Sequence, residues 1–269
     1  MALSSKGPNG TLRKSGFHQA LQSDLEDAKE VHKAFFPEED LFIPGLTCET
    51  FYKPLRCIGG DYYDLIALRN DCWGIAIGDV CGKGIGAALL MASLQASLRA
   101  QAMYPYSDLC TLIADVNRLI GAASPKHLYA SLFYAEYKAA TRVLRYVNAG
   151  HNAPMVARWS QNHCEVFYLE SSAAPIGLFE NSQFTSEVFQ LEAGDVLVAY
   201  TDGITDMENP KREPWGQERL EILLRTCRGC TPAEMLRRIL DEILAFAKDR
   251  SQRDDMTLMV VAVKQETGI

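Results

Sequence analysis

Residues 73–100, WGIAIGDVCGKGIGAALLMASLQASLRA, contain an apolar run, then an aspartate, then a glycine-rich turn and an apolar segment long enough for a helix. Glycine and polar turn residues commonly mark the end of a strand, so Asp79 is predicted to lie at a strand end. Three further aspartates adjoin turns and β-prone apolar sequence in the same way: Asp61 in CIGGDYYD, Asp202 in LVAYTDGITD and Asp254 in RDDMTLMVV. The four carboxylates together indicate one metal cluster.

Carboxylates gathered at the ends of neighbouring strands repel one another unless divalent cations compensate their charge. A donor set without histidine or cysteine favours magnesium or manganese over zinc or copper. Two such ions lower the pKa of a bridging water and neutralise a phosphoryl group under in-line attack. Phosphoester hydrolysis is therefore the predicted reaction.

Each aspartate taken singly also has a structural explanation. Aspartate commonly forms turns, which would account for Asp61 and Asp202. Asp79 would serve equally as a helix cap, and Asp254 as the polar residue that leads into a strand. The joint occurrence of all four at apolar strand boundaries favours the functional interpretation.

Composition excludes several classes of protein. The chain has 269 residues, 48% of them apolar, and a formal charge of −7, which suits one large domain or two small ones. The acidic balance, with no basic stripe, argues against nucleic acid as a partner. No apolar run reaches the ~20 residues that span a bilayer, and the N-terminus lacks the apolar core of a signal peptide. We expect a cytoplasmic protein without membrane insertion.

The eight cysteines do not form a disulfide scaffold in a chain of this length. Reduced thiols are expected, several of them as small apolar residues in the core. Cys227 and Cys230 form the one C-x-x-C, in TCRGCTPAEM, and no second pair nearby completes a four-ligand zinc site. A structural role is favoured for this pair over a redox or zinc-binding role.

The N-terminal part of the chain divides into a tail and a helix. Residues 1–15 are rich in Ser, Gly and Lys, show no periodicity and are predicted to be disordered. Residues 16–37 are predicted to form a helix that Pro37 ends, because apolar positions follow the rhythm of a two-stranded helical seam. These positions are Leu21, Leu25, Ala28, His32 and Phe35. Two heptads leave open whether this helix packs on its own domain or dimerises.

Residues 38–269 are predicted to form one domain of mixed structure. Strands are expected over 46–52, 62–69, 73–80, 129–137, 143–148, 155–158, 166–169, 185–191, 196–200 and 256–263. Helices are expected over 85–103, 107–120, 217–226 and 232–248. The strands between residues 129 and 200 have connections too short for crossovers, so the pattern predicts an α+β layered fold with mostly antiparallel pairing.

The motif series also resembles a known family. PLRCIGGDYYD, GDVCGKGIGAALLMA, NAGHNAP, APIGL, YTDGITD and DDMTLMVV, in this order, are similar to the SpoIIE-type bacterial branch of the metal-dependent protein phosphatases, relatives of protein phosphatase type 2C. The resemblance covers about residues 40–264, and the helix ending in AFFPEED is similar to the linker helix that precedes this domain in that branch. It implies a four-layer α-β-β-α sandwich, in which two mainly antiparallel sheets are flanked by helices.

The resemblance further implies a centre of two divalent cations, Mn²⁺ or Mg²⁺. Asp79 would bridge both ions, while Asp61 and the backbone carbonyl of Val80 would complete one coordination sphere. Asp202 and Asp254 would hold the other ion.

Asp255 is the adjacent alternative for the last ligand, and Asp254 is ranked first because it matches the family's first aspartate in this motif.

By the same resemblance, the activity is that of a protein serine/threonine phosphatase that uses a metal-activated water. The implied substrate is a phosphorylated STAS-domain anti-sigma-factor antagonist. The helix over 16–37 is the expected control element, acting through homodimerisation. The alternative is a catalytically silent binding module that keeps the fold to sense or sequester a signalling partner; loss of a metal ligand would be its signature, and all four aspartates are present.

Three other features of the sequence are His151, Arg56 and a glycine-rich turn. His151 in NAGHNAP is interpreted as a hydrogen-bonded structural group, with an acid or base role as the secondary possibility. Arg56 is a candidate for phosphate contact, although the branch lacks the arginine clamp of the eukaryotic relatives, so that phosphate affinity would depend on the metals. Gly82, Gly84 and Ala87 fit a dinucleotide-binding fingerprint, but two helices follow in succession where that fold needs a second parallel strand.

Overall fold

The computed structural model describes residues 9–38, 41–104, 106, 108–125, 127–161 and 163–265. Within these residues, ten strands form two five-stranded sheets. Sheet A has the order β1-β10-β9-β6-β7 and sheet B the order β2-β3-β4-β5-β8. Every pair of neighbouring strands is antiparallel.

The strands of sheet A are β1 (Leu46–Lys53), β6 (Met155–Trp159), β7 (Cys164–Tyr168), β9 (Val196–Tyr200) and β10 (Met256–Val263). Those of sheet B are β2 (Tyr62–Ala67), β3 (Cys72–Val80), β4 (Ala130–Lys138), β5 (Val143–Ala149) and β8 (Glu187–Gln190). The helices are α1 (Asn9–Lys33), α2 (Ile85–Met103), α3 (Leu109–Ala123), α4 (Asp202–Thr205), α5 (Gln217–Arg225) and α6 (Pro232–Ala247). The elements expected over 46–263 occur within a few residues of their predicted bounds, α1 begins and ends earlier than the predicted 16–37, and the short α4 was not predicted.

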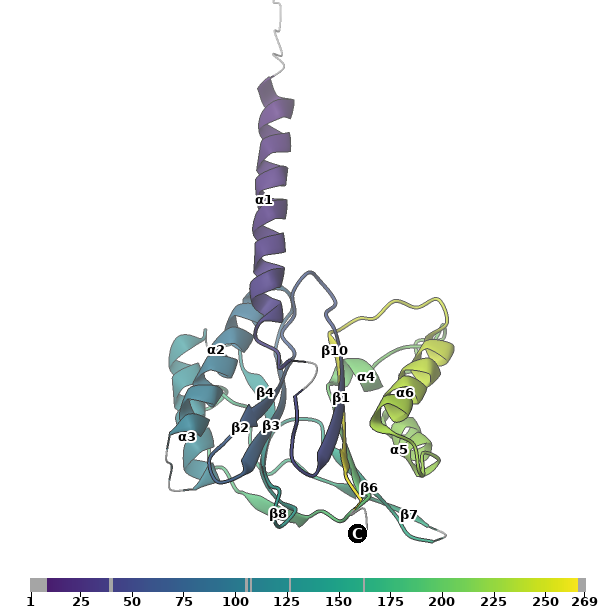
Figure 1. Ribbon diagram of the computed structural model, residues 1–269. Coiled ribbons are helices and arrows are strands. Elements are labelled where there is room, and N and C mark those ends of the chain that lie inside the picture. The colour runs from purple at the N-terminus through teal and green to yellow at the C-terminus, as the bar shows by residue number, and fades with distance from the viewer. Residues whose placement is uncertain are drawn as a thin grey trace, which may run out of the picture.

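The elements stack in four layers, as expected. Figure 1 shows α2 and α3 on one outer side, the two sheets in the middle and α5 and α6 on the other outer side. Sheet B packs against α2 and α3, and sheet A packs against α5 and α6. The predicted α-β-β-α sandwich is confirmed.

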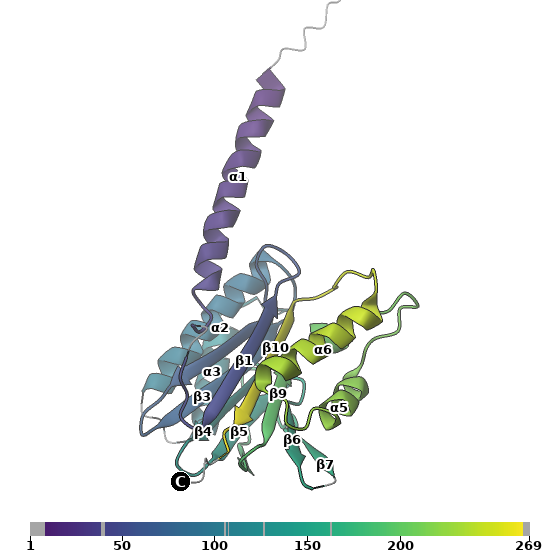
Figure 2. The same cartoon turned by 45° about the vertical axis from the view of Figure 1, so that its right-hand side comes forward.

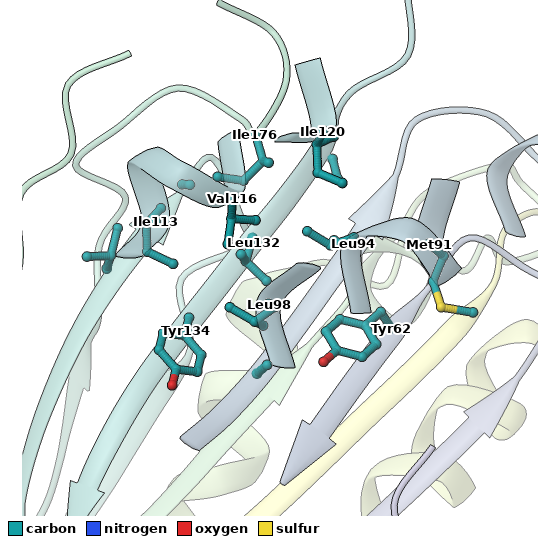
Figure 3. Packing of buried hydrophobic residues seen from close by; sticks show 14 of the residues in the cluster. Tyr62, Met91, Leu94, Leu98, Ile113, Val116, Ile120, Leu132, Tyr134 and Ile176 are labelled. Carbon is teal, nitrogen blue, oxygen red and sulfur yellow. The ribbon is translucent and has the colours of Figure 1, made fainter. Parts of the chain in front are cut away.

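Apolar side chains fill the space between sheet B and its two helices (Figure 3). Met91, Leu94 and Leu98 of α2 recur at helical spacing and are fully buried. They meet Tyr62 and Leu132 from the sheet, which lie on one face because alternate strand residues point the same way. This packing fixes α2, and hence the turn that precedes it, against the end of β3.

Two more apolar layers complete the sandwich. Ile77, Phe133 and Met259 are fully buried between the sheets. Ile239 of α6 and Val260 of β10 belong to the layer between sheet A and its helices. Since β10 contributes to both layers, its position is set from both faces.

Helix α1 projects away from the sandwich (Figures 1 and 2). Its last turn contacts the domain, because His32 is buried and its Nε2 lies 3.1 Å from the carbonyl oxygen of Gly59. Phe36, just beyond the helix, stacks on Tyr52 with ring centroids 4.6 Å apart. Leu21, by contrast, remains 46% exposed.

The start of α1 differs from the sequence-based prediction. Residues 9–15 were expected to be disordered, yet the helix begins at Asn9, while residues 1–8 lie outside the described part of the chain. The expectation was wrong for residues 9–15, because a helix that has nucleated extends at small cost through residues without apolar periodicity. In the described residues no helix is both long and apolar enough to span a membrane.

Candidate metal centre

Antiparallel pairing brings the four predicted aspartates to one edge of the sandwich. In sheet B, β2 begins directly after Asp61 and pairs with the end of β3, where Asp79 lies. In sheet A, β10 begins after Asp254 and pairs with the end of β9, which Asp202 follows. The ends of two strands and the beginnings of two others therefore meet at the same edge. Each aspartate lies at a strand boundary, as the sequence predicted.

Asp61 joins the two sheets by hydrogen bonds. Its carboxylate is buried, and Oδ2 accepts from the hydroxyls of Thr201 at 2.7 Å and Thr257 at 2.6 Å. Thr201 Oγ1 also accepts from the backbone N–H of Thr257 at 3.0 Å. These contacts fix Asp61 relative to the strands that carry Asp202 and Asp254.

The aspartates influence one another's ionisation. Burial is the main cause that raises the pKa of Asp79 far above its ordinary range, and the charges of Asp61, Asp202 and Asp254 raise it further. Burial also raises the pKa of Asp61, against the lowering effect of its two threonine hydrogen bonds. The pKa of Asp202 is raised by burial and by Asp254. The four side chains thus lie within electrostatic reach of one another.

This crowding of acidic oxygens fits a hard divalent cation, which would favour the ionised form of each carboxylate. Among the described residues, no three His, Cys, Asp or Glu side chains stand in the arrangement of a completed metal cluster. What supports the fit is therefore the donor chemistry and the uncompensated charge of Asp61 and Asp79. Asp254 differs from these two, because the ammonium of Lys83 contacts its carboxylate.

Asp254 and Asp255 have different surroundings. Asp255 is buried, and its two oxygens accept from the backbone N–H groups of Leu55 at 2.7 Å and Gly60 at 2.6 Å. Asp254 has a side chain that is 31% exposed and accepts no hydrogen bond from the 55–60 segment. This geometry favours Asp254 as the ligand and gives Asp255 the task of fixing the loop before Asp61.

Two glycines allow close approach of the backbone at this edge. The N–H of Val80 donates to the carbonyl of Gly60 at 3.3 Å, and a Cβ on Gly60 would lie 3.0 Å from the Val80 carbonyl oxygen. A Cβ on Gly203 would overlap the carbonyl oxygen of Asp255. Glycine at these positions therefore keeps the Val80 carbonyl clear and lets α4 begin beside β10.

The other aspartate of the GGDYYD motif has a structural role. Asp64 is fully buried and accepts two hydrogen bonds from the Arg99 guanidinium, each 2.7 Å long, and one from the Tyr62 hydroxyl, also 2.7 Å. Such a bidentate pair is strong and directional. It ties β2 to α2 and explains why this second carboxylate is not part of the centre.

His151 and Arg56 lie outside the group of four. His151 is buried, its Nδ1 lies 2.8 Å from the hydroxyl of Ser131, and burial lowers its pKa to about 4. A neutral, hydrogen-bonded histidine of this kind agrees with the structural interpretation. Arg56 is exposed and lies against Gly84 in the turn after β3.

The C-x-x-C lies in the connection between α5 and α6. Cys227 is buried and donates its S–H to the carbonyl of Leu223, with 3.3 Å between the sulfur and the oxygen. Cys230 Sγ lies 3.4 Å from a guanidinium nitrogen of Arg238. Within the described residues no third His, Cys, Asp or Glu completes a zinc site here.

Sequence reasoning found the aspartates but missed three residues around them. Thr201 and Thr257 orient Asp61, and Lys83 contacts Asp254. One signal was available: each threonine lies within three residues of a predicted ligand, in YTDG and DDMT. Spacing of that kind does not say which carboxylate the hydroxyl reaches.

Solved structures share this fold. The SiaA-PP2C domain of Pseudomonas aeruginosa matches with a TM-score of 0.77 and 18% identity, over 90% of this chain and 97% of that one. RsbX, solved in complex with magnesium, matches with a TM-score of 0.58 and 16% identity, over 80% of this chain and 94% of that one. The two stacked antiparallel sheets with helices on both sides define the fold of the PP2C class.

Within that class, the chain belongs to the family of stage II sporulation protein E (SpoIIE), whose model matches residues 69–264. It is 28% identical to Protein IcfG of Synechocystis sp., over 88% of this chain and 41% of IcfG. It is also 28% identical to phosphoserine phosphatase RsbU of Bacillus subtilis, over 94% of this chain and 73% of RsbU. The chain thus spans less than half the length of IcfG.

Proposed function

We propose that this protein is a metal-dependent protein serine/threonine phosphatase that hydrolyses phosphoserine or phosphothreonine on a partner protein. The observation that carries the proposal is the group of Asp61, Asp79, Asp202 and Asp254 at one edge of the sandwich, where the charges of the other three raise the pKa of Asp79. The name of its relative RsbU, a phosphoserine phosphatase, supports the same reaction.

Each aspartate has a distinct task in this proposal. Asp79 would be shared between two cations. Asp61 and the Val80 carbonyl would hold one of them, called the inner cation. Asp202 and Asp254 would hold the outer one. Bound Mn²⁺ or Mg²⁺ would supply the Lewis acidity that lowers the pKa of water and neutralises phosphoryl charge.

The chain's own contribution is to preorganise these ligands. Thr201 and Thr257 donate to one oxygen of Asp61, Oδ2, which leaves Oδ1 for a cation. Asp255 fixes the loop before Asp61 through Gly60. Such support reduces the reorganisation of the ligands when charge develops in the transition state. In this way a rigid sandwich would assist hydrolysis without a covalent intermediate.

The proposed substrate is a phosphorylated STAS-domain protein, and the proposed control element is α1. The resemblance of the motif series to the SpoIIE-type branch implies this substrate class, and the name of the relative RsbU, a phosphoserine phosphatase, supports a phosphoserine substrate. The exposed Leu21 on a helix that projects from the domain supports a homodimer formed through α1. His32 at the end of α1 contacts Gly59, two residues before Asp61, so a change in α1 has a direct route to the centre.

Phosphate release from a phosphoserine protein, measured while Mn²⁺ is titrated, tests the proposal. Wild type should turn over with Mn²⁺, and Asp79→Asn should lose activity because the shared ligand is weakened. Asp115→Asn, a change at a half-exposed carboxylate of α3, is the matched control and should behave as wild type.

The alternative function is a silent phosphatase-fold module that senses or sequesters a signalling partner. Retention of all four aspartates favours the enzyme. A wild type that binds Mn²⁺ and a phosphorylated partner, yet releases no phosphate at saturating metal, would favour the module.

A further inference from the structure

Lys83 reaches across the edge of the sandwich. It lies in the turn between β3 and α2, between Gly82 and Gly84, which adopt φ angles of 105° and 74°. Its ammonium contacts the carboxylate of Asp254 and the carbonyl oxygen of Arg253, in the segment before β10. One side chain thus connects the loop of sheet B that follows Asp79 with the loop of sheet A that carries Asp254.

Lys83 also supplies the positive charge of the outer half of the centre, which Asp202 and Asp254 form. Its ammonium contacts Asp254, and Asp202 follows β9, the strand that pairs with β10 just beyond Asp254. The nearby Arg250 and Arg253 both pair with Glu208 instead. In the part of the chain that the structure describes, no other Lys or Arg forms an ion pair with any of the four aspartates.

The inner half is arranged differently. Asp61 is buried, and its carboxylate accepts hydrogen bonds from the neutral hydroxyls of Thr201 and Thr257. Neutral donors do not offset its charge, whereas Lys83 already offsets part of the charge of Asp254. A divalent cation that approaches the centre therefore meets no basic side chain at the inner half and has to displace Lys83 at the outer half.

We infer that Lys83 is the resident counter-ion of the Asp202–Asp254 pair and competes with the divalent cation for it. The inference rests on the proposed metal-dependent function. It adds that the two metal positions differ in their affinity for the cation. The Lys83 side chain is 36% exposed on a flexible four-carbon stem, so it can move into solvent when a cation displaces it. The outer position consequently loads at higher cation concentration than the inner one.

Mn²⁺ binding to the full chain without substrate tests this inference. Free Mn²⁺ is counted by electron paramagnetic resonance, and titration calorimetry gives the affinities. Wild type should show a tighter and a weaker event. Lys83→Gln, which keeps a donor for the Arg253 carbonyl but removes the charge, should tighten the weaker event about tenfold, equivalent to ~1.4 kcal/mol.

Two further variants serve as controls. Lys83→Arg keeps the charge, so its weaker event should stay within a few-fold of wild type. Lys138→Met removes a positive charge at the opposite end of the same sheet, where the side chain is exposed, and should leave both events unchanged. Circular dichroism in EDTA verifies that each variant is folded, and Lys83→Met replaces Lys83→Gln if the latter is not.

The outcomes separate this inference from the proposed function. Two Mn²⁺ events in wild type, with neither tightened in folded Lys83→Gln or Lys83→Met, would overturn the role of Lys83 and leave the phosphatase proposal standing. Equal tightening in Lys138→Met would also overturn it, since net charge alone would then explain the effect. A wild type that binds no Mn²⁺ would refute both.

Discussion

Replacing Asp255 with alanine is expected to destabilise the metal-free protein far more than replacing its neighbour Asp254. The buried carboxylate of Asp255 accepts hydrogen bonds of 2.7 Å from the Leu55 N–H and 2.6 Å from the Gly60 N–H. Hydrogen bonds to a charged group contribute ~1.5–3 kcal/mol each, and alanine would leave two N–H groups without a partner. The sum predicts a loss of about 3–6 kcal/mol in the free energy of unfolding.

The matched change at Asp254 removes a different kind of interaction. Its ion pair with Lys83 joins side chains that are 31% and 36% exposed, and pairs of this kind contribute about 0–1 kcal/mol. Asp254→Ala should therefore unfold at nearly the wild-type urea concentration in EDTA. With Mn²⁺ present, wild type should gain stability through ligand binding and Asp254→Ala should gain less.

Urea unfolding followed by circular dichroism, with EDTA and then with Mn²⁺, measures both effects. The reasoning would be refuted if Asp255→Ala lost less than about 1 kcal/mol in EDTA, since that value lies below the contribution of a single charged hydrogen bond. It would also be refuted if Asp254→Ala gained as much stability from Mn²⁺ as wild type, because Asp254 would then not be a ligand.

Three other changes follow from the same geometry. Gly203→Ala should lower both stability and Mn²⁺ affinity, since its Cβ would overlap the Asp255 carbonyl oxygen; a variant with wild-type urea unfolding and Mn²⁺ titration would contradict this. In EDTA, the folded-state pKa values of Asp61 and Asp79 lie above the ~3.9 of an unfolded chain. The folded protein therefore holds more protons than the unfolded chain above about pH 4. Its stability should decline as pH rises from about 4 through the raised values. Mn²⁺ binding should correspondingly release protons and tighten with pH; calorimetry in buffers of different ionisation enthalpy detects that release, and its absence would count against the raised values. Removing residues 1–24, which keeps the His32 contact with Gly59, should convert a dimer to a monomer and change the rate of phosphate release; light scattering and rates identical to the full chain would rule out control through α1.

The sequence was sufficient to predict where each aspartate lies along its strand. Glycine and polar turns beside apolar runs are local signals, and they located Asp61 before β2 and Asp79 at the end of β3 correctly. The antiparallel pairing followed from the short connections between strands, whereas the order of the four layers came from the resemblance to the SpoIIE-type branch. By contrast, the first turn of α1 was missed, because residues 9–15 carry no apolar periodicity of their own.

The supporting contacts could not be predicted in the same way. Thr201 and Thr257 reach Asp61 across 140 and 196 positions of the chain, from one sheet to the other. Nothing local in DDM distinguishes Asp254 from Asp255, yet the fold points one toward Lys83 and the other toward the Gly60 N–H. Such pairings depend on how the sheets stack, which no local pattern encodes.

The hydrogen bonds of Asp61 have a consequence for synthesis of the protein. Asp61 belongs to the first quarter of the chain, and its partner Thr257 is 196 residues further on. A ribosome that has made sheet B but not β9 has made only Asp61 and Asp79, half of the proposed ligands. The nascent chain is therefore expected to remain catalytically silent until almost all of it has emerged, so translation itself delays the onset of phosphate removal.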